Sequence, residues 1–514
     1  MESFNQYLLF LILIVPAIAA VVLLFLPGRR ENLIRWVAFV VSLIPLGLTI
    51  YAWTQFDSSL AGYQFESNLN WFEAIHSSFH LGIDGISLTM VLLTTLLTPL
   101  SILASFGIKD RVKAYMILFL LLETGVLGVF LSLDLLLFFV FWEIGLVPMY
   151  FLINQWGGAN RNYASLKFLL FTMAGSLGLL LSIQMIGVVV GSFDLNQIAA
   201  VWPTITQADL TQKLPLNLSL ETIKNITFWA FVVAFAIKVP IWPFHTWLPD
   251  AHTEAPTAGS MMLAGVLLKL GAYGFLRLVL PLFPQEAYRY SEALAILATA
   301  SIIFGALSAF GQKDLKRLVA YSSINHMGFV VLGIAAAARA WGSSDPGIQL
   351  SANIALNGTV LQMFNHGLSA AGMFFLVGVI YDRAHTRDLD NFGGLWAILP
   401  VFGTIFVFTS MASLGLPGLN GFVSEFLVVR GAWAIYPWET ALSMIGLFFT
   451  GAYVLKAIAK VLHGPLNTKW IGKLSEINLR EILVIAPLMA LMLWIGIWPA
   501  WILDIINRAV NMLF

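Results

Sequence analysis

The stretch "AFAIKVPIWPFHTWLPDAH", residues 234–252, combines two features that are costly in an apolar helix. Lys238 lies inside an apolar run, where an ionised side chain carries a large desolvation penalty. Pro240, Pro243 and Pro249 follow within a dozen residues, and each proline interrupts helical hydrogen bonding. In a bilayer, broken helices occur where the freed backbone lines a water-filled cavity. We therefore interpret this stretch as a broken transmembrane helix with a functional lysine beside the break.

The composition of the whole chain is that of a polytopic membrane protein. Of its 514 residues 59% are hydrophobic and only 11% are charged, and the mean hydropathy is +0.86. A soluble domain of this size exposes far more charge. The net charge of zero gives no basic footprint for a nucleic-acid partner. The chain has no cysteine, which excludes disulfides and a thiolate-held iron–sulfur cluster, and it has no phosphate-binding loop.

Apolar segments long enough to span a bilayer recur along the entire sequence. They predict an all-α polytopic fold of about 14 transmembrane helices. The N-terminal stretch has neither a basic n-region nor a cleavage site, so we interpret it as a retained first helix and not as a signal peptide. The predicted helices cover 6–27, 33–54, 82–106, 113–131, 133–152, 164–191, 224–249, 258–281, 291–311, 316–338, 353–381, 397–433, 440–463 and 483–504.

The loops between these helices differ in charge in a regular way. The loops after the first, third, ninth and thirteenth helices are rich in lysine and arginine, whereas residues 55–81 contain neither. The positive-inside rule places the odd-numbered loops in the cytoplasm or its organellar equivalent. We therefore expect both termini on the lumenal or periplasmic side.

A second broken helix resembles the first. The stretch "SLGLPGLNGFVSEF", residues 413–426, places Gly415, Pro417 and Gly418 in the middle of the twelfth helix. Breaks in helices seven and twelve, five helices apart, predict two five-helix repeats of inverted topology, as in many transporters. The predicted parts are three N-terminal helices (1–112), a first repeat (113–281), a second, inverted repeat (291–463) and a C-terminal helix (464–514).

Several ionisable side chains lie at mid-helix depth, where each carries an insertion penalty of roughly 2.5–3.5 kcal/mol. Glu123 and Glu143 are equally far from a turn near Leu133, so they are expected at similar depth. The same argument applied to a turn at 250–257 places Lys238 and Lys269 at one level.

The second half of the chain carries its own set of buried polar groups. Glu425 follows the second break, and Gln362, His366 and Ser369 form one polar stripe on the eleventh helix. His326 lies on the tenth helix. Burial favours the neutral forms of lysine and glutamate, and histidine titrates near neutrality, so such groups can pass a proton through intervening water.

These residues predict a proton relay through Glu143, Lys238, Lys269, His326 and Glu425. The further candidates are Glu123, as a group that tunes its neighbouring carboxylate, and His366. Structural alternatives exist for each: snorkelling lysines, a carboxylate that satisfies a helix break, and satisfied core histidines. His245 and His252 are expected to be interfacial. No metal-ligand spacing is present, and a b-type haem between the two relay histidines is a weak alternative that nothing nearby supports.

Five stretches carry a family resemblance: "LGIDGISL" (81–88), "FWEIGLVPMYFLI" (141–153), "KVPIWPFHTWLPDAHTEAPTAGS" (238–260), "KDLKRLVAYSSINHMG" (313–328) and "GLPGLNGFVSEF" (415–426). They resemble the antiporter-like proton-translocating subunits of respiratory complex I, which are related to subunits of multisubunit Na+/H+ antiporters. Glutamate at position 425 and the end of the chain after the last helix are similar to the M/D type, subunit 4. The wording "LNGFVSEFLVV" is similar to the D-type subunits of the cyanobacterial and chloroplast NAD(P)H dehydrogenase-like complex, which takes electrons from ferredoxin to plastoquinone.

The resemblance implies a role for each relay residue. Glu143 and Lys238 would form the charge pair at an input half-channel, and Lys269 would be the connecting site. His326 would bridge to the second half, and Glu425 would be the exit-side site. The chain itself would hold no cofactor, because iron–sulfur clusters and quinone belong to partner subunits. Expected partners are an L/F-type and a B/N-type antiporter-like subunit, other membrane-arm subunits, the lipid bilayer, and plastoquinone only through the complex.

The resulting functional hypothesis is a proton-translocating membrane-arm subunit of a type-1 NAD(P)H/ferredoxin–plastoquinone oxidoreductase. It would be a translocase subunit without redox chemistry of its own. The expected location is a cyanobacterial thylakoid membrane, with a bacterial plasma membrane as the alternative. Two other functions stay open: a subunit of a multisubunit Na+/H+ antiporter, and a structural scaffold whose charges are relics. The sequence does not separate the respiratory D-type subunits from those of CO2-uptake variants.

Overall fold

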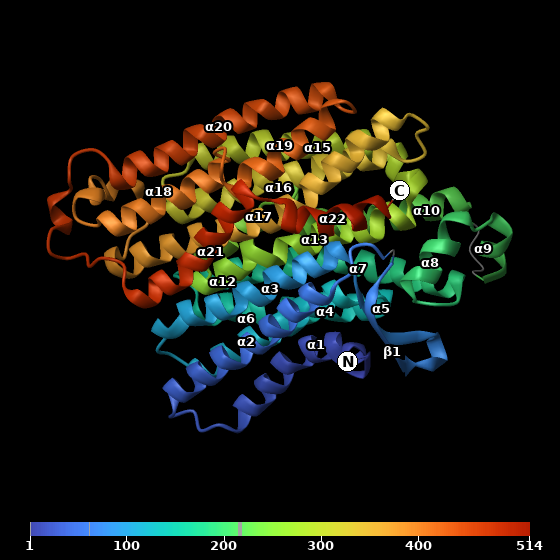
Figure 1. Ribbon diagram of the computed structural model, residues 1–514, viewed down its shortest axis with the longest axis horizontal. Coiled ribbons are helices and arrows are strands. Elements are labelled where there is room, and N and C mark those ends of the chain that lie inside the picture. Colours follow the sequence, from blue (N-terminus) through green and yellow to red (C-terminus); the bar gives the residue numbers. More distant parts are fainter. Residues whose placement is uncertain (1, 61, 214–217, 514) are drawn as a thin grey trace.

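The computed structural model describes residues 2–60, 62–213 and 218–513 and shows an elongated bundle of helices that run in alternating directions (Figure 1). Thirteen helices among these residues are long and apolar enough to cross a membrane. The remaining predicted helix, the twelfth, is the broken pair α18 (Pro400–Leu414) and α19 (Asn420–Trp433). The predicted all-α polytopic fold is thereby confirmed. The relation of its two halves as inverted repeats stays a prediction.

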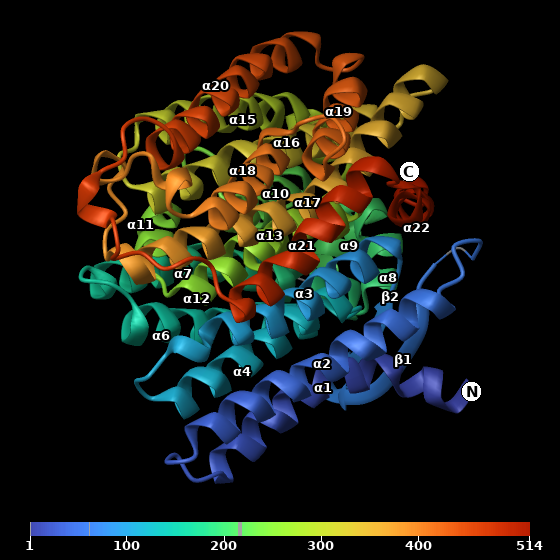
Figure 2. The ribbon, with the colours of Figure 1, turned by 60° about the vertical axis from the view of Figure 1, so that its left-hand side comes forward.

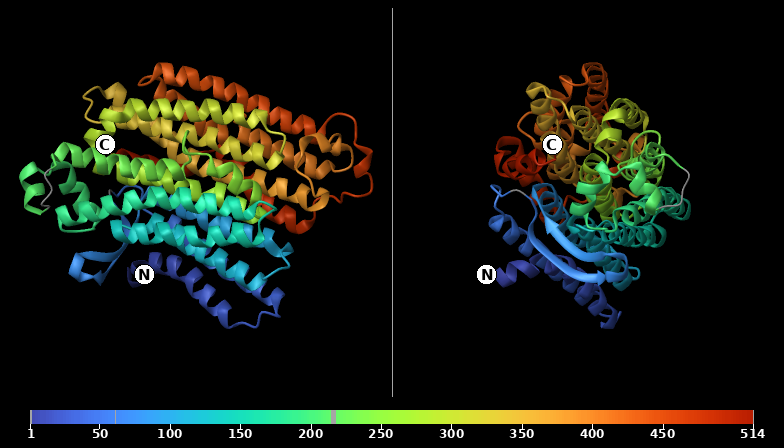
Figure 3. Two further views of the ribbon diagram at one scale, coloured as in Figure 1. Left: turned by 180° about the vertical axis from the view of Figure 1, so that it is seen from behind. Right: turned by 90° about the vertical axis from the view of Figure 1, so that its right-hand side faces the viewer.

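The bundle is layered around two buried spans. The segment 257–282 and helix α17 (Pro346–Ala384) are the spans whose apolar windows are completely buried, so they form the centre. Helices α1 (Glu2–Phe25) and α2 (Glu31–Gln55) form one outer edge, and α20 (Pro437–Leu462) forms the opposite edge (Figure 2). Both termini lie toward the same end of the bundle (Figure 3), as an even number of crossings requires.

The remaining helices of the first half, in chain order, are α3 (Gly85–Ala104), α4 (Val112–Leu131), α5 (Leu135–Ile144), α6 (Leu146–Trp156), α7 (Arg161–Val190), α8 (Leu195–Val201), α9 (Gln207–Lys213), α10 (Leu220–Lys238), α11 (Trp247–Glu254), α12 (Thr257–Met262), α13 (Leu268–Gly274) and α14 (Leu280–Leu282). Those of the second half are α15 (Pro284–Gly311), α16 (Leu315–Ala340), α21 (Leu479–Ile497) and α22 (Ala500–Asn511). Aspartate side chains cap several starts: Asp84 accepts from backbone N–H groups at the start of α3, and Asp134 does so at α5.

Three predicted helices and one predicted turn differ from the structure. The helix expected at 133–152 divides at Gly145 into α5 and α6, and the helix expected at 224–249 ends at Lys238. The turn expected at 250–257 is largely helix α11. The last predicted helix, 483–504, ends at Ile497, where Pro499 cannot continue its hydrogen bonding, and α22 begins as a separate helix.

A β-hairpin replaces the loop expected at 55–81 and the first turn of the helix expected at 82–106. Strand β1 (Gln64–Phe72) pairs antiparallel with β2 (Ser77–Ile83), and the hairpin lies at one end of the bundle (Figure 3). His80 anchors it: its Nε2 lies 3.0 Å from Glu66 and its Nδ1 lies 2.8 Å from Asp194, at the start of α8. The hairpin is thus tied to the first half of the bundle by a charged cluster outside the membrane spans.

This cluster predicts a pH-dependent attachment of the hairpin. Burial lowers the pKa of His80, but the bonds to Asp194 and Glu66 outweigh it, so the pKa is raised above its ordinary value. The pKa of Asp194 is lowered, because its bond to His80 outweighs its burial. The stabilisation of the hairpin attachment by protonated His80 is complete below about pH 6.5 and is lost as pH rises through the raised pKa of His80. The stabilisation by ionised Asp194 is present above about pH 3.9 and is lost as pH falls through the lowered pKa of Asp194.

Attachment should therefore be strongest at mildly acidic pH. We expect the opening free energy of the amides in residues 77–83, from hydrogen exchange, to fall by about 1–2 kcal/mol between pH 5.5 and pH 9. His80→Gln should remove this dependence, whereas His76→Gln, which changes an exposed histidine of the same hairpin, should leave it intact. An unchanged pH dependence in His80→Gln would show that another group is responsible.

Candidate proton-relay site

The first break lies directly after Lys238. Residues 239–246 form turns between α10 and α11, and Pro240 and Pro243 lie within them. Side chains satisfy the freed backbone groups: the Trp247 indole N–H donates to the Ile237 carbonyl at 2.8 Å, and the backbone N–H of Trp242 donates to the Ser301 hydroxyl at 2.8 Å. The break is therefore an ordered part of the protein interior, as its membrane depth demands.

Lys238 is buried, and its side-chain amine lies over an aromatic ring. Its side chain is 2% exposed, and Nζ lies 4.9 Å from the centre of the Trp142 ring. Glu143 is the next residue of α5, and its Oε1 is buried without a hydrogen-bond partner among the described residues. No ion pair within 4 Å joins Lys238 and Glu143 in the part of the chain that the structure describes. The predicted charge pair is therefore not a direct contact, and the indole of Trp142 lies next to both groups.

Glu143 also lies beside a helix break that the sequence interpretation missed. An added Cβ at Gly125 of α4 would lie 2.6 Å from the backbone nitrogen of Gly145, so the two helices touch through their glycines. Glu123 and Glu143 each lie within one turn of this contact, which agrees with the expected similar depth. Glu123 is fully buried, and neither of its carboxylate oxygens has a hydrogen-bond partner among the described residues.

Lys269 occupies the centre of the bundle. It lies on α13, which is flanked by π-helical turns at Leu263–Leu267 and Phe275–Val279, a feature frequent at functional sites. Its Nζ donates to the Ala264 carbonyl within the first π turn and lies 2.8 Å from Nδ1 of His366. Nε2 of His366 lies 3.2 Å from the Ser323 hydroxyl. Lys269 is therefore joined directly to the second half of the molecule.

Glu425 and His326 form the second buried cluster. Oε1 of Glu425 lies 2.6 Å from Nδ1 of His326 and accepts a hydrogen bond from the Gln362 amide at 2.9 Å. Nε2 of His326 lies 3.2 Å from the Tyr453 hydroxyl. The rings of His326 and His366 are 5.7 Å apart, so the two clusters adjoin. With their nitrogens engaged in these contacts and their rings this close, the two histidines leave no room for a haem between them.

The structure thus brings together four of the seven predicted residues as a contiguous chain, in the order Lys269, His366, His326 and Glu425. Lys238, Glu143 and Glu123 form a separate group, and no hydrogen bond among the described residues links Lys238 to Lys269. The second break, at 415–419, precedes Glu425, and Gly415 and Gly418 adopt positive φ there. Among the described residues no cluster of histidine and acidic side chains is placed to hold a metal ion.

Residues 132–450 match the family model described as "NADH:quinone oxidoreductase/Mrp antiporter, TM", and residues 10–133 match "NADH-ubiquinone oxidoreductase chain 4, amino terminus". "NADH-quinone oxidoreductase subunit M" of Rickettsia bellii is 40% identical over 477 residues, which cover 93% of this chain and 91% of the relative. The chain belongs to the subunit M, or chain 4, family of complex I.

Another relative and two solved structures are similar over nearly the whole chain. Subunit M of Rhodobacter capsulatus is 39% identical over 510 residues, 98% of this chain and 96% of the relative. A chain of respiratory complex I from Thermus thermophilus superposes with a TM-score of 0.83 at 27% identity, covering 98% of this chain and 99% of that one. A chain of the Mrp complex from Dietzia shares the fold, with a TM-score of 0.82 at 22% identity and coverage of 99% and 98%.

Sequence reasoning missed several polar residues of this subunit M site. Trp142 lies beside Lys238, Ser323 beside His366 and Tyr453 beside His326, and Asn365 donates to the Asn420 carbonyl at 2.7 Å across the second break. Ser323 lies in the polar run "YSSINH" (321–326), and Tyr453 lies in a largely apolar helix, and these were the available signals. His252, expected at an interface, is instead fully buried and stacked on Phe374 with ring centres 4.3 Å apart.

Proposed function

We propose that this chain translocates protons across the membrane as a subunit of an NADH-quinone oxidoreductase-type complex, without a redox step of its own. The observation that carries the proposal is the buried chain from Lys269 through His366 and His326 to Glu425. Each contact joins groups that can hold or release a proton. Apolar residues at these positions would insert into the membrane at a lower free-energy cost. Because the chain instead carries four ionisable residues in contact at membrane depth, a functional role is favoured.

The first half supplies the loading site in this proposal. Lys238 lies beside an ordered helix break, and Glu143 lies beside the break between α5 and α6. A change in the charge of Glu143 alters the field at Lys238, which then releases its proton toward Lys269. Intervening water is required for that step, because the two lysines share no hydrogen bond among the described residues. Glu123 tunes the field at Glu143.

A polar cavity lies at one end of the bundle. A cavity of about 550 Å³ is lined by Lys109, Glu254, Lys316 and Arg387, on the face with the lysine- and arginine-rich loops. We place this face in the cytoplasm or its equivalent and both termini on the lumenal or periplasmic side. The inverted repeats, at 113–281 and 291–463, would carry the loading and exit sites respectively.

The identity of the complex is a further part of the proposal. The wording "LNGFVSEFLVV", residues 419–429, supports a D-type subunit of a ferredoxin–plastoquinone oxidoreductase in a cyanobacterial thylakoid membrane. L/F-type and B/N-type subunits would be its neighbours, and iron–sulfur clusters and quinone would lie in other subunits. The purified complex should then reduce a plastoquinone analogue with reduced ferredoxin and not with NADH. Rapid NADH oxidation would instead indicate a respiratory complex.

The Glu143→Gln variant tests the relay. We expect the complex to assemble and the protons pumped per electron to fall about two- to fivefold, because the charge that acts on Lys238 is lost without a direct bond being broken. The measurement is the acidification of proteoliposomes during quinone reduction. The control Glu73→Gln removes an exposed carboxylate of the hairpin and should leave pumping unchanged.

The alternatives make different predictions in the same vesicles. A scaffold predicts undiminished pumping in Glu143→Gln. A Na+/H+ antiporter predicts a proton flux that requires a sodium gradient and persists without quinone turnover. Either result would replace the proposal.

A further inference from the structure

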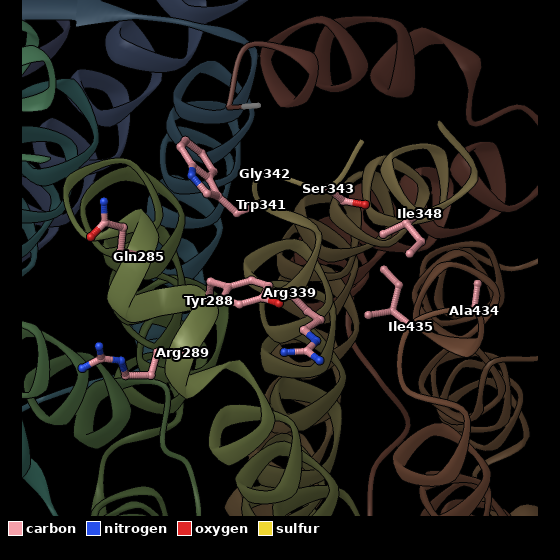
Figure 4. A pocket seen from close by; sticks show the side chains of 10 residues that line it. All are labelled: Gln285, Tyr288, Arg289, Arg339, Trp341, Gly342, Ser343, Ile348, Ala434 and Ile435. Carbon is pink, nitrogen blue, oxygen red and sulfur yellow. The ribbon is translucent and has the colours of Figure 1, made fainter. Parts of the chain in front are cut away.

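A cavity of about 850 Å³, whose lining Figure 4 shows, lies apart from the relay. It is at the end of the bundle opposite the lysine- and arginine-rich loops, near the turn between α16 and α17. The start of α15, the turn between α16 and α17, and the end of α19 meet there. All of these are ends of membrane-embedded helices, so the cavity lies at the level of the lipid headgroups. Its volume is within the range of small-molecule sites.

The lining of the cavity is cationic and has no acidic side chain. Its residues are Gln285, Tyr288, Arg289, Arg339, Trp341, Gly342, Ser343, Ile348, Ala434 and Ile435. The guanidinium of Arg339 lies 4.9 Å from the centre of the Tyr288 ring and forms no ion pair within 4 Å with any described residue. Arg289, the next residue on α15, is engaged at one nitrogen by Glu221 at 2.6 Å. An oxyanion is the ligand that this lining would complement.

The other large side chains that line the cavity are apolar or aromatic and would pack against the acyl chains of an amphiphile. Figure 4 shows Arg339 between Tyr288 on one wall and Ile435 on the other, with Ile348 on the second wall and Trp341 at the turn. Tyrosine and tryptophan favour the headgroup level of a bilayer, where one part of the ring is apolar and another is wet. Arginine binds phosphate in a planar, two-pronged geometry.

We propose that this cavity binds the headgroup of an anionic phospholipid from the lumenal or periplasmic leaflet. The lipid phosphate contacts Arg339 and, secondarily, Arg289, and its glycerol and upper acyl carbons pack on Trp341, Ile348 and Ile435. The site is independent of the proton relay and of the proposed function. It binds a lipid at the far end of the second half, where α16, α17 and α19 converge.

The test uses the intact, delipidated complex in neutral detergent. Its thermal unfolding midpoint is titrated with short-chain phosphatidylglycerol, short-chain phosphatidylcholine and inorganic phosphate. We expect phosphatidylglycerol to stabilise the wild type, and its half-saturating concentration to rise about five- to tenfold in Arg339→Gln. Phosphatidylcholine and inorganic phosphate should have little effect. Arg430→Gln, which removes an exposed arginine on α19 that does not line the cavity, should behave as the wild type.

A second variant tests the site independently, in case Arg339→Gln prevents assembly of the complex. Ala434→Trp keeps both arginines but fills the cavity, and it should also raise the half-saturating concentration. Equal weakening in Arg430→Gln would show general attraction between arginines and an anionic lipid, and would overturn the site. If inorganic phosphate stabilises the complex at concentrations similar to those of phosphatidylglycerol, the cavity binds a free anion and the proposal of a lipid site is wrong. Unchanged binding in both Arg339→Gln and Ala434→Trp would likewise overturn the proposal.

Discussion

Lys269→Met is expected to reduce proton pumping by the assembled complex at least about tenfold, one of the two largest effects expected for the residues of the proposed relay. Lys269 is fully buried at the centre of the bundle, and its only side-chain partner among the described residues is His366. Methionine occupies a similar volume but can neither bind nor release a proton. The contact that joins the two halves of the relay is therefore lost.

The stability of this variant separates a relay from a scaffold. A lysine at mid-membrane depth costs roughly 2.5–3.5 kcal/mol to insert, so its replacement by methionine should leave the thermal stability of the complex unchanged or raise it. Pumping is measured as acidification per electron in proteoliposomes. Lys224→Met removes a buried lysine outside the relay, whose Nζ donates to the Pro203 carbonyl, and should keep full pumping. Normal pumping in Lys269→Met would exclude this lysine from the path.

Glu425→Gln is expected to lower pumping by a similar factor, about tenfold or more, for a different reason. The amide can still accept from Gln362 and His326, which lie 2.9 and 2.6 Å from Oε1, so the second cluster should keep its geometry. What is lost is the carboxylate, which in the proposed relay accepts the proton from His326. The proton would then stop at the histidine.

Two companion variants sharpen this prediction. Glu425→Asp keeps the carboxylate but shortens its reach, so an intermediate rate of pumping is expected. Glu292→Gln removes an exposed carboxylate of α15 and should have no effect on pumping. If Glu425→Gln pumps normally while Glu425→Asp is impaired, the residue acts through packing and the exit role is wrong.

The sequence predicted the helices well where hydrophobic length alone decides them. It failed where partners far along the chain decide local structure. The hairpin depends on His80 reaching Asp194. The division of α5 from α6 had a local signal, because Pro148 cannot donate to the Ile144 carbonyl. The packing of Gly125 against Gly145 at the same point had none. A lone glycine in an apolar run carries no signal of such a contact.

The candidate site shows the same limit. Charges in apolar helices identified Lys238, Lys269 and Glu425, because the penalty for burying them is a property of the sequence itself. By contrast, the contacts between these side chains depend on how the helices pack, which the sequence does not state. His326 was expected to bridge to Lys269, yet the structure gives that contact to His366 and pairs His326 with Glu425. Trp142 carries no charge, so the sequence offered no sign that its ring lies beside Lys238.

Helix α17 has a consequence for how the second half responds. His366, the partner of Lys269, and Gln362, a partner of Glu425, are separated by one turn in the buried part of this helix. A small axial rotation of α17 would therefore lengthen or shorten both contacts together. In the proposed relay, protonation at Lys269 and protonation at Glu425 are then coupled through this helix, so a proton-binding measurement at either residue should depend on the state of the other.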